Sequence, residues 1–75
     1  MIVKYETVGK LIRYHRLSKK MTQEELAFRI ESSPAYISYM ESGKKKPSLE
    51  KLMDIADVLG VTVNDFVYGP ASVRD

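Results

Sequence analysis

The amino-acid sequence predicts an all-α fold, a compact domain of five short helices, and three observations support this prediction. Apolar residues recur three and four positions apart, which is the period of a helix that buries one face. Residues that cap or end helices divide these stretches into five segments. The chain of 75 residues contains no cysteine, so a single small core must hold the fold without disulfide bonds.

The first two helices are indicated by an apolar stripe and by a capping pattern. A helix over about residues 7–19 would bury Val8, Leu11, Ile12 and His15. Thr22 and Glu25 have the spacing of a capping box, in which the Thr22 hydroxyl accepts from the Glu25 amide and the Glu25 side chain returns to the Thr22 amide. The second helix therefore starts there and turns inward Leu26, Ala27 and Ile30.

The other three helices are bounded by Ser, Thr, Pro and Gly residues. Ser33 followed by Pro34 is typical of a helix start, and Gly43 of a left-handed helix end. A third helix is therefore expected through Ser42, with Ile37 and Met40 in the core. A fourth is expected from Ser48 to Gly60, with the apolar residues Leu49, Leu52, Met53, Ile55, Ala56 and Leu59. A short fifth helix would be capped by Thr62 and Asp65 and would close the core with Phe66.

No repeat, low-complexity tract or linker interrupts the chain, so residues 1–75 are expected to form one domain with a core over about 7–68 and a tail over 69–75. Charge is unevenly distributed along it. Residues 1–47 contain ten Lys and Arg against five Glu, a net charge of +5, whereas residues 48–75 contain two bases against five acids, a net charge of −3. The first two thirds can therefore present a basic face to a polyanion.

The connection between the second and third helices indicates a function. About three turn residues, Glu31, Ser32 and Ser33, separate two short helices, which is the spacing of a helix-turn-helix whose second helix enters the DNA major groove. The third helix has an anchoring face with Ile37 and Met40. Its other residues are expected outside, where side chains can reach base edges: Pro34, Ala35, Tyr36, Ser38 and Tyr39.

A family resemblance extends from about Val8 to Val67. It is carried by the order and spacing of Val8-Gly9, Ile12, Arg16, Thr22-Gln23-Glu24-Glu25-Leu26-Ala27, Tyr36-Ile37-Ser38, Glu41-Ser42-Gly43, Pro47-Ser48-Leu49, Ile55-Ala56 and Leu59-Gly60-Val61. With these residues the chain resembles the phage repressor and Cro-like helix-turn-helix family of XRE-type transcriptional regulators. The resemblance implies a lambda-repressor-like fold and sequence-specific binding of double-stranded DNA, expected in a repressor.

The resemblance also implies a set of DNA contacts. Gln23 would bond a phosphate, helped by the positive end of the second helix; the alternative is a solvent-exposed first-turn glutamine. Pro34, Ala35 and Tyr39 would face base edges, and Ser33, Tyr36 and Ser38 would lie near sugar and phosphate. Amide side chains that read adenine in better-known members are missing here. Direct readout is therefore expected to be sparse, with a contribution from DNA shape.

Charged residues outside the third helix have separate expected roles. Lys44, Lys45 and Lys46 would lie along the DNA backbone, adding affinity and salt dependence, unless they form only a solvated loop. Arg13 is either an exposed phosphate ligand or a plain surface arginine. The family has an ion pair at the positions of Arg16 and Glu41, which would tie the first helix to the end of the third.

Several residues depart from the family pattern or invite another interpretation. His15 stands where leucine is more frequent and is expected at the edge of the core. Lys20 and Glu31 replace two glycines, at a cost of about 1 kcal/mol each if their φ angles are positive. The methionines expected as core fillers, with no metal role, are Met21, Met40 and Met53.

Enzymatic activity is not indicated, because the chain has one histidine, no cysteine, no glycine-rich phosphate loop and no convergent carboxylate pair. No cofactor, metal or small-molecule effector is expected. No apolar run approaches the roughly 20 residues that span a bilayer, so a soluble cytoplasmic protein of prokaryotic or phage origin, associated with the nucleoid, is expected. The alternative function is a protein-interaction module of antitoxin or coactivator type on the same fold, for which Tyr36 and Tyr39 would be suitable anchors.

Oligomerisation is expected because a single domain of this size buries little surface on half of an operator. Tight binding then requires a two-fold homodimer on a pseudo-palindromic site. The expected interface is the apolar end of the chain, formed by Val61, Val63, Phe66, Val67 and Tyr68. The alternative is a short strand formed across the interface by residues 2–5.

Overall fold

The structure is a computed structural model and describes residues 4–68. Within this range it contains helices and no strand: α1 (Tyr5–Ser18), α2 (Gln23–Arg29), α3 (Pro34–Glu41), α4 (Leu49–Leu59) and α5 (Val63–Tyr68). The expected all-α fold of five helices is confirmed. None of these helices is long and apolar enough to cross a membrane. The expected tail over 69–75 lies outside the described residues.

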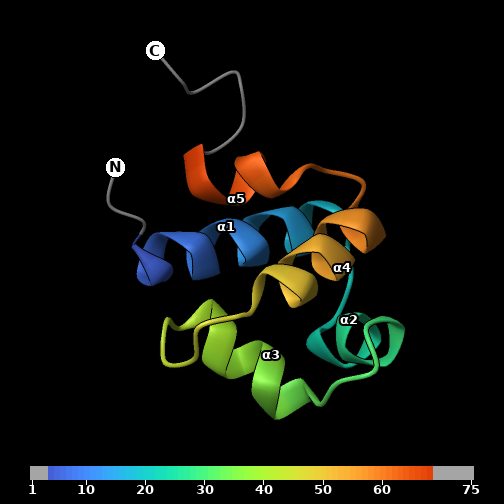
Figure 1. Ribbon diagram of the computed structural model, residues 1–75. Helices are drawn as coiled ribbons and strands as arrows, with labels where there is room; N and C mark the ends of the chain where they lie inside the picture. The colour runs from blue at the N-terminus through green and yellow to red at the C-terminus, as the bar shows by residue number, and fades with distance from the viewer. Residues whose placement is uncertain (1–3, 69–75) are drawn as a thin grey trace.

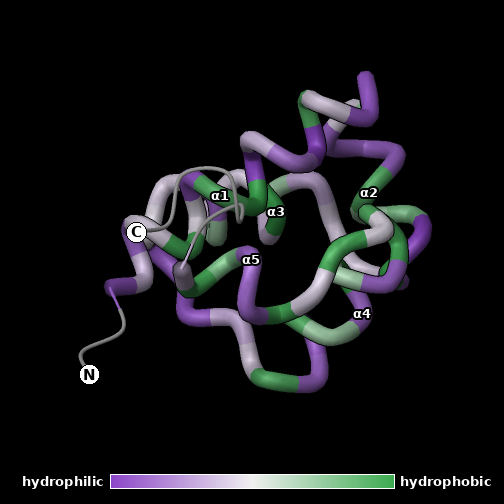
Figure 2. Tube along the Cα trace, turned by 90° about the horizontal axis from the view of Figure 1, so that it is seen from above, coloured by the Kyte–Doolittle hydropathy of each residue, from purple (hydrophilic) through white to green (hydrophobic). Residues whose placement is uncertain are grey.

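Helix α1 forms the middle of the molecule. It packs against α3 on one side and against α5 on the other, while α2 and α4 complete the domain (Figure 1). Hydrophobic and hydrophilic residues alternate along the helices, as Figure 2 shows. The hydrophobic ones meet in one core, whose buried residues are Val8, Ile12, Met21, Leu26, Ala27, Ile30, Ile37, Met40, Leu52, Ile55, Ala56, Leu59 and Phe66.

Four helix starts are capped by the residues that the sequence indicates. The hydroxyl oxygens of Thr22, Ser33 and Ser48 each accept a hydrogen bond from the backbone amide three residues later, at 3.0 to 3.1 Å. At α5 the Asp65 carboxylate accepts from the Thr62 amide at 2.9 Å. These contacts satisfy amides that would otherwise lack a partner in the first helical turn.

Two expected features at helix starts differ from the structure. Helix α1 begins at Tyr5, two residues before the expected Thr7, because the Lys4 carbonyl accepts from the Val8 amide at 3.0 Å and closes an earlier turn. The alternative strand over residues 2–5 is therefore wrong at Tyr5, and its residues 2 and 3 lie outside the described range. The Glu25 carboxylate lies 3.7 Å from Arg29, one turn later, and does not complete the expected capping box.

The core differs from the sequence prediction on α4. Met21 and Met40 are buried as expected, but Met53 is 56% exposed and Leu49 is 65% exposed. The inward face of α4 is already formed by Leu52, Ile55, Ala56 and Leu59, and the helical period turns positions 49 and 53 to one side of it. Met53 is therefore not a core residue.

His15 lies at the edge of the core, as expected. Its ring packs edge-on against Tyr14 at 5.0 Å and against Phe66 at 5.8 Å between ring centroids. Phe66 itself is fully buried, so its assignment to a dimer interface is wrong. A side chain that fills the protein's own core has no surface left for a partner.

Gly9 allows α1 to approach the end of α3 closely. A Cβ atom at this position would lie 2.2 Å from the Met40 carbonyl oxygen and 2.7 Å from that of Glu41. Both neighbours are backbone atoms and cannot rotate out of the way. The position of α3 relative to α1 therefore depends on a residue without a side chain.

Replacement of Gly9 tests this close approach. We expect Gly9→Ala to destabilise the fold by about 1–3 kcal/mol, because the added methyl forces two backbones apart. In a helix without tertiary contacts the same change would stabilise by up to about 1 kcal/mol, so the sign is diagnostic. Urea unfolding measures it, with the exposed Lys10→Ala as the matched control. A stabilised Gly9→Ala protein would contradict the packing described here.

Lys20 and Glu31 adopt left-handed backbone conformations, with φ angles of 55° and 54°. Each follows the end of a helix, where the chain turns toward the next one. The φ angles at both positions are therefore positive, which is the condition under which replacing glycine was expected to cost stability. Residues other than glycine are strained in this region.

Glycine at either position should relieve that strain. We expect Lys20→Gly and Glu31→Gly each to stabilise the protein by up to about 1 kcal/mol, less the entropy that glycine adds to the unfolded chain. The matched control is Lys19→Gly, since Lys19 has a φ of −91° and gains nothing from glycine. Thermal unfolding of the three variants would contradict the interpretation if all three lost stability equally.

Candidate nucleic-acid interface

Helices α2 and α3 and residues 30–33 between them form a helix-turn-helix. The turn is closed by backbone hydrogen bonds from Ser32 to Ala27 at 2.8 Å and from Glu31 to Phe28 at 3.3 Å. The Lys51 ammonium of α4 donates to the Ile30 carbonyl at 3.0 Å, which places a cation at the negative end of α2. The turn is therefore held from both sides.

Helix α3 divides into a buried and an exposed face. Ile37 and Met40 are 0% and 1% exposed and anchor the helix, as the sequence indicates. Tyr36 was expected outside, but it is half-buried and packs against the core, so it presents only part of its ring. The exposed residues on this helix and its N-cap are Ser33, Pro34, Ala35, Ser38 and Tyr39.

The three lysines after α3 are exposed and are attached to this helix through the Tyr39 carbonyl. That oxygen accepts from the backbone amides of Lys44 and Lys45, at 2.9 and 3.2 Å, and from the Ser42 hydroxyl at 3.1 Å. Gly43, at a φ of 82°, turns the chain so that these bonds form. We call residues 44–46 the lysine loop. Its backbone is thereby fixed against the end of the exposed helix.

The lysine loop also contacts the start of α1. The Lys46 ammonium lies 5.4 Å from the centroid of the Tyr5 ring, within the range of a cation–π interaction. Lys4, which precedes this ring, is exposed. The cation–π contact thus joins the start of α1 to the loop that follows α3.

A buried ion pair connects α1 to the end of α3. The Arg16 guanidinium donates to both Glu41 carboxylate oxygens, at 2.6 and 3.0 Å, and to the Met21 carbonyl at 2.7 Å. Arg16 is 6% exposed and Glu41 is 8% exposed. The pair that the resemblance implies is thus present and is shielded from water, which makes it a structural element and not a contact for a ligand.

Gln23 joins this pair from the first position of α2. Its amide nitrogen donates to Glu41 at 3.1 Å, and its side chain is half-buried, so it is not simply a solvent-exposed residue. One N–H of the amide group remains for another acceptor. Arg13, one turn before Arg16 on α1, is exposed.

Three contributors to the site were not singled out from the sequence. Gly9 sets the approach of α1 to α3, Lys51 caps α2, and Tyr5 contacts the lysine loop. Only Gly9 left a signal, because a glycine inside a helical stretch suggests close packing. Within residues 4–68 no cluster of side chains is suited to hold a metal ion.

The geometry of α2, the turn and α3 defines a helix-turn-helix protein, and comparison with known proteins agrees. A helix-turn-helix family model matches residues 12–66. The control protein C.BamHI of Bacillus amyloliquefaciens is 40% identical over 60 residues, covering 79% of this chain and 74% of that protein. The immunity repressor protein of Bacillus phage phi105 is 36% identical over 69 residues, covering 92% of this chain and 48% of the repressor, so the chain spans about half of that relative.

Solved structures show the same arrangement of helices. The clp gene regulator ClgR from Corynebacterium glutamicum is 32% identical with a TM-score of 0.85, covering 99% of this chain and 95% of the other. The P22 c2 repressor protein, in a crystal structure with a synthetic operator, is 25% identical with a TM-score of 0.78, covering 84% of this chain and 96% of the other. This chain belongs to the helix-turn-helix family of DNA-binding transcriptional regulators.

The role of the ion pair can be tested by a double-mutant cycle. Arg16→Met leaves the Glu41 carboxylate buried without its partner and is expected to cost about 3–5 kcal/mol. The double variant Arg16→Met and Glu41→Leu, which removes both charges, should recover much of this loss. The matched control is Arg13→Met, an exposed arginine on the same helix, with an expected effect within about 0.5 kcal/mol. If urea unfolding shows that the losses in free energy of unfolding at positions 16 and 41 simply add in the double variant, direct coupling of Arg16 and Glu41 is contradicted.

Proposed function

We propose that this protein is a transcriptional repressor that reads a pseudo-palindromic operator with α3, as a homodimer in the cytoplasm. The observation that carries the proposal is the shape of α3, which has a buried anchor and an exposed face bordered by the lysine loop. Such a helix can enter the major groove while adjacent cations meet the phosphates. The control protein and the phage repressors among the relatives support a role of this kind.

We assign readout and affinity to different residues. Pro34, Ala35 and Tyr39 face base edges, where Ala35 suits a thymine methyl and the Tyr39 hydroxyl offers one hydrogen bond. The phosphate and sugar contacts are assigned to Gln23, through its remaining N–H, and to Arg13, Ser33, Tyr36, Ser38, Lys44, Lys45 and Lys46. Since few side chains reach bases, part of the specificity is assigned to DNA shape.

The dimer interface that we propose is smaller than the one expected from sequence. Val61 and Val63 pack partly against the core, Val67 is half-buried and Tyr68 is 49% exposed. These four residues, without Phe66, form the proposed patch. Sedimentation as a monomer at micromolar concentration, both with and without operator DNA, would contradict the dimer.

Selection of bound duplexes from a random pool tests the function and reports the sequence, symmetry and spacing of the site together. We expect an inverted repeat with half-sites about one helical turn apart. The affinity for the selected duplex should fall steeply with salt, because phosphate contacts release counterions. No measurable duplex binding at low salt would contradict the proposal and favour the protein-interaction module. No catalytic or cofactor-dependent activity is part of the proposal.

Two substitutions separate readout from affinity. Tyr39→Ala should reduce discrimination between the selected duplex and single-base variants of it, because it removes a group that faces base edges. Lys45→Ala should weaken binding to all of these duplexes by about the same factor and lower the salt slope by about one unit. Binding titrations at several salt concentrations measure both quantities. Identical effects of the two substitutions would contradict the assigned roles.

A further inference from the structure

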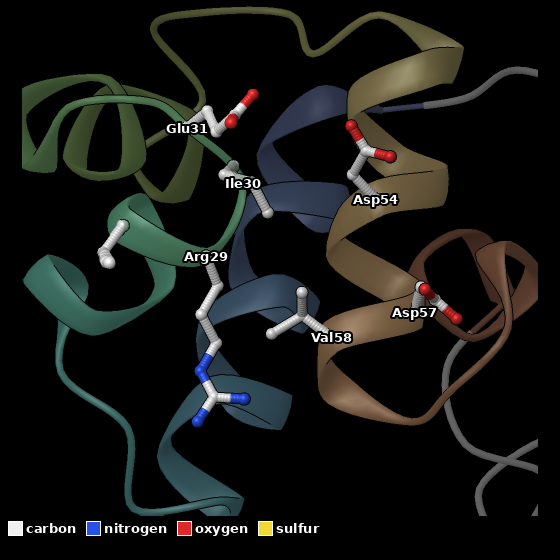
Figure 3. A pocket seen from close by; sticks show the side chains of 7 residues that line it. Arg29, Ile30, Glu31, Asp54, Asp57 and Val58 are labelled. Atoms are coloured by element: carbon white, nitrogen blue, oxygen red, sulfur yellow. The ribbon is translucent and has the colours of Figure 1, made fainter.

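A groove between α2 and α4 is lined by exposed acidic and apolar side chains. Figure 3 shows it with α2 on one side, α4 on the other and α1 passing behind. Phe28, at its edge, is 73% exposed, the most exposed of the large hydrophobic residues within positions 4–68. The other lining residues that matter here are Arg29, Glu31, Asp54, Asp57 and Val58.

The groove is acidic. Glu31, Asp54 and Asp57 are exposed carboxylates, and within residues 4–68 none of them forms an ion pair. Arg29 is the basic residue of the lining, and it lies 3.7 Å from Glu25 on its own helix. An acidic surface repels DNA phosphates, so the groove does not extend the nucleic-acid interface. Its chemistry suits an apolar segment that carries positive charge.

Helix α1 carries such a segment on its outer face. Tyr14 and Leu17 are 55% and 52% exposed, and Lys10 is exposed one turn before Tyr14. Their spacing of four and three residues places them on one stripe, which we call the α1 stripe. Val8 and Ile12 on the same helix are buried in the core, so the stripe faces away from it. Helix α1 passes behind the groove in Figure 3, and the stripe is on the face of α1 that points away from the core.

We propose that the α1 stripe of one copy of this chain docks into the α2–α4 groove of a second copy. Tyr14 and Leu17 cover Phe28 and Val58, and Lys10 meets Asp54 and Asp57. The two surfaces are complementary in both apolar character and charge. The contact is head-to-tail, which distinguishes it from a two-fold dimer.

The consequence of this contact is cooperative binding of neighbouring copies. One helix face in one groove buries little surface, so a dissociation constant of about 0.1 to 1 mM is expected in free solution. Copies held side by side on one duplex experience an effective concentration of millimolar order, which is enough to populate such a contact. The inference goes beyond the proposed function and can be tested without DNA.

Two complementary variants isolate the contact. Leu17→Glu blocks the stripe and leaves the groove intact, whereas Phe28→Ala blocks the groove and leaves the stripe intact. We expect unlabelled Phe28→Ala protein, added to isotope-labelled Leu17→Glu protein, to shift NMR signals of α2 and α4 around the groove. Reversing the label should move the shifts to the α1 stripe. The matched control titrant is the double variant Leu17→Glu and Phe28→Ala, which retains any contact through α5 but offers neither surface.

Charge reversal gives a second measurement. Asp57→Lys in the labelled chain should weaken the titration several-fold, and Lys10→Glu in the titrant should restore it. Asp57→Lys also replaces Phe28→Ala as the groove-blocking change if the latter does not fold, which the spectra show directly. Arg13 is left unchanged because it is a proposed phosphate ligand. Equal shifts with the single-variant titrant and with the double-variant control, up to about 1 mM, would overturn the proposal. DNA binding by the same proteins would be unaffected by that result.

Discussion

The buried pair of Arg16 and Glu41 is the interaction on which the position of α3 depends. Arg16 donates two hydrogen bonds to Glu41 and a third to the Met21 carbonyl, and Gln23 donates one more to the Glu41 carboxylate. These contacts join α1, the start of α2 and the end of α3. A helix that reads DNA must be held in one orientation, because its side chains recognise base edges through hydrogen bonds, which form only over a narrow range of distances and angles. The pair provides this orientation from behind the helix, where no ligand competes for it.

Steric fit supports the same arrangement. Gly9 brings α1 into contact with the last carbonyls of α3. The Arg16 and Glu41 side chains therefore meet at hydrogen-bond distance and away from water. The Tyr39 carbonyl then fixes the backbone of the lysine loop beside the exposed face of α3. The C-terminal end of α3 thus sets both the orientation of α3 and the position of the lysine loop. A change at Gly9 or Arg16 is expected to disturb both together.

The charges of the molecule are separated by function. Lysines border α3, where a polyanion is expected, while carboxylates line the groove between α2 and α4. The net charge of +2 conceals this division. The readout that we propose for Ala35 and Tyr39 makes few base contacts, so additional sources of selectivity would be valuable. The proposed contact between neighbouring copies would be one such source, because two sites would then be recognised together.

The sequence by itself determined the helices, their caps and most of the core, because spacing and capping are local properties of a chain. Ser33 with Pro34, Gly43 and Gly60 indicated helix ends that the structure contains. The burial of Met53 and a free surface on Phe66 were predicted wrongly, since which side of a helix is covered depends on its neighbours. Gln23 was assigned to DNA from resemblance alone, and only the tertiary structure brought it to Glu41, 18 residues away. The groove and the α1 stripe were likewise visible only in the tertiary structure. Which side chains are exposed, and which charges lie next to one another, depends on segments that are far apart in the sequence.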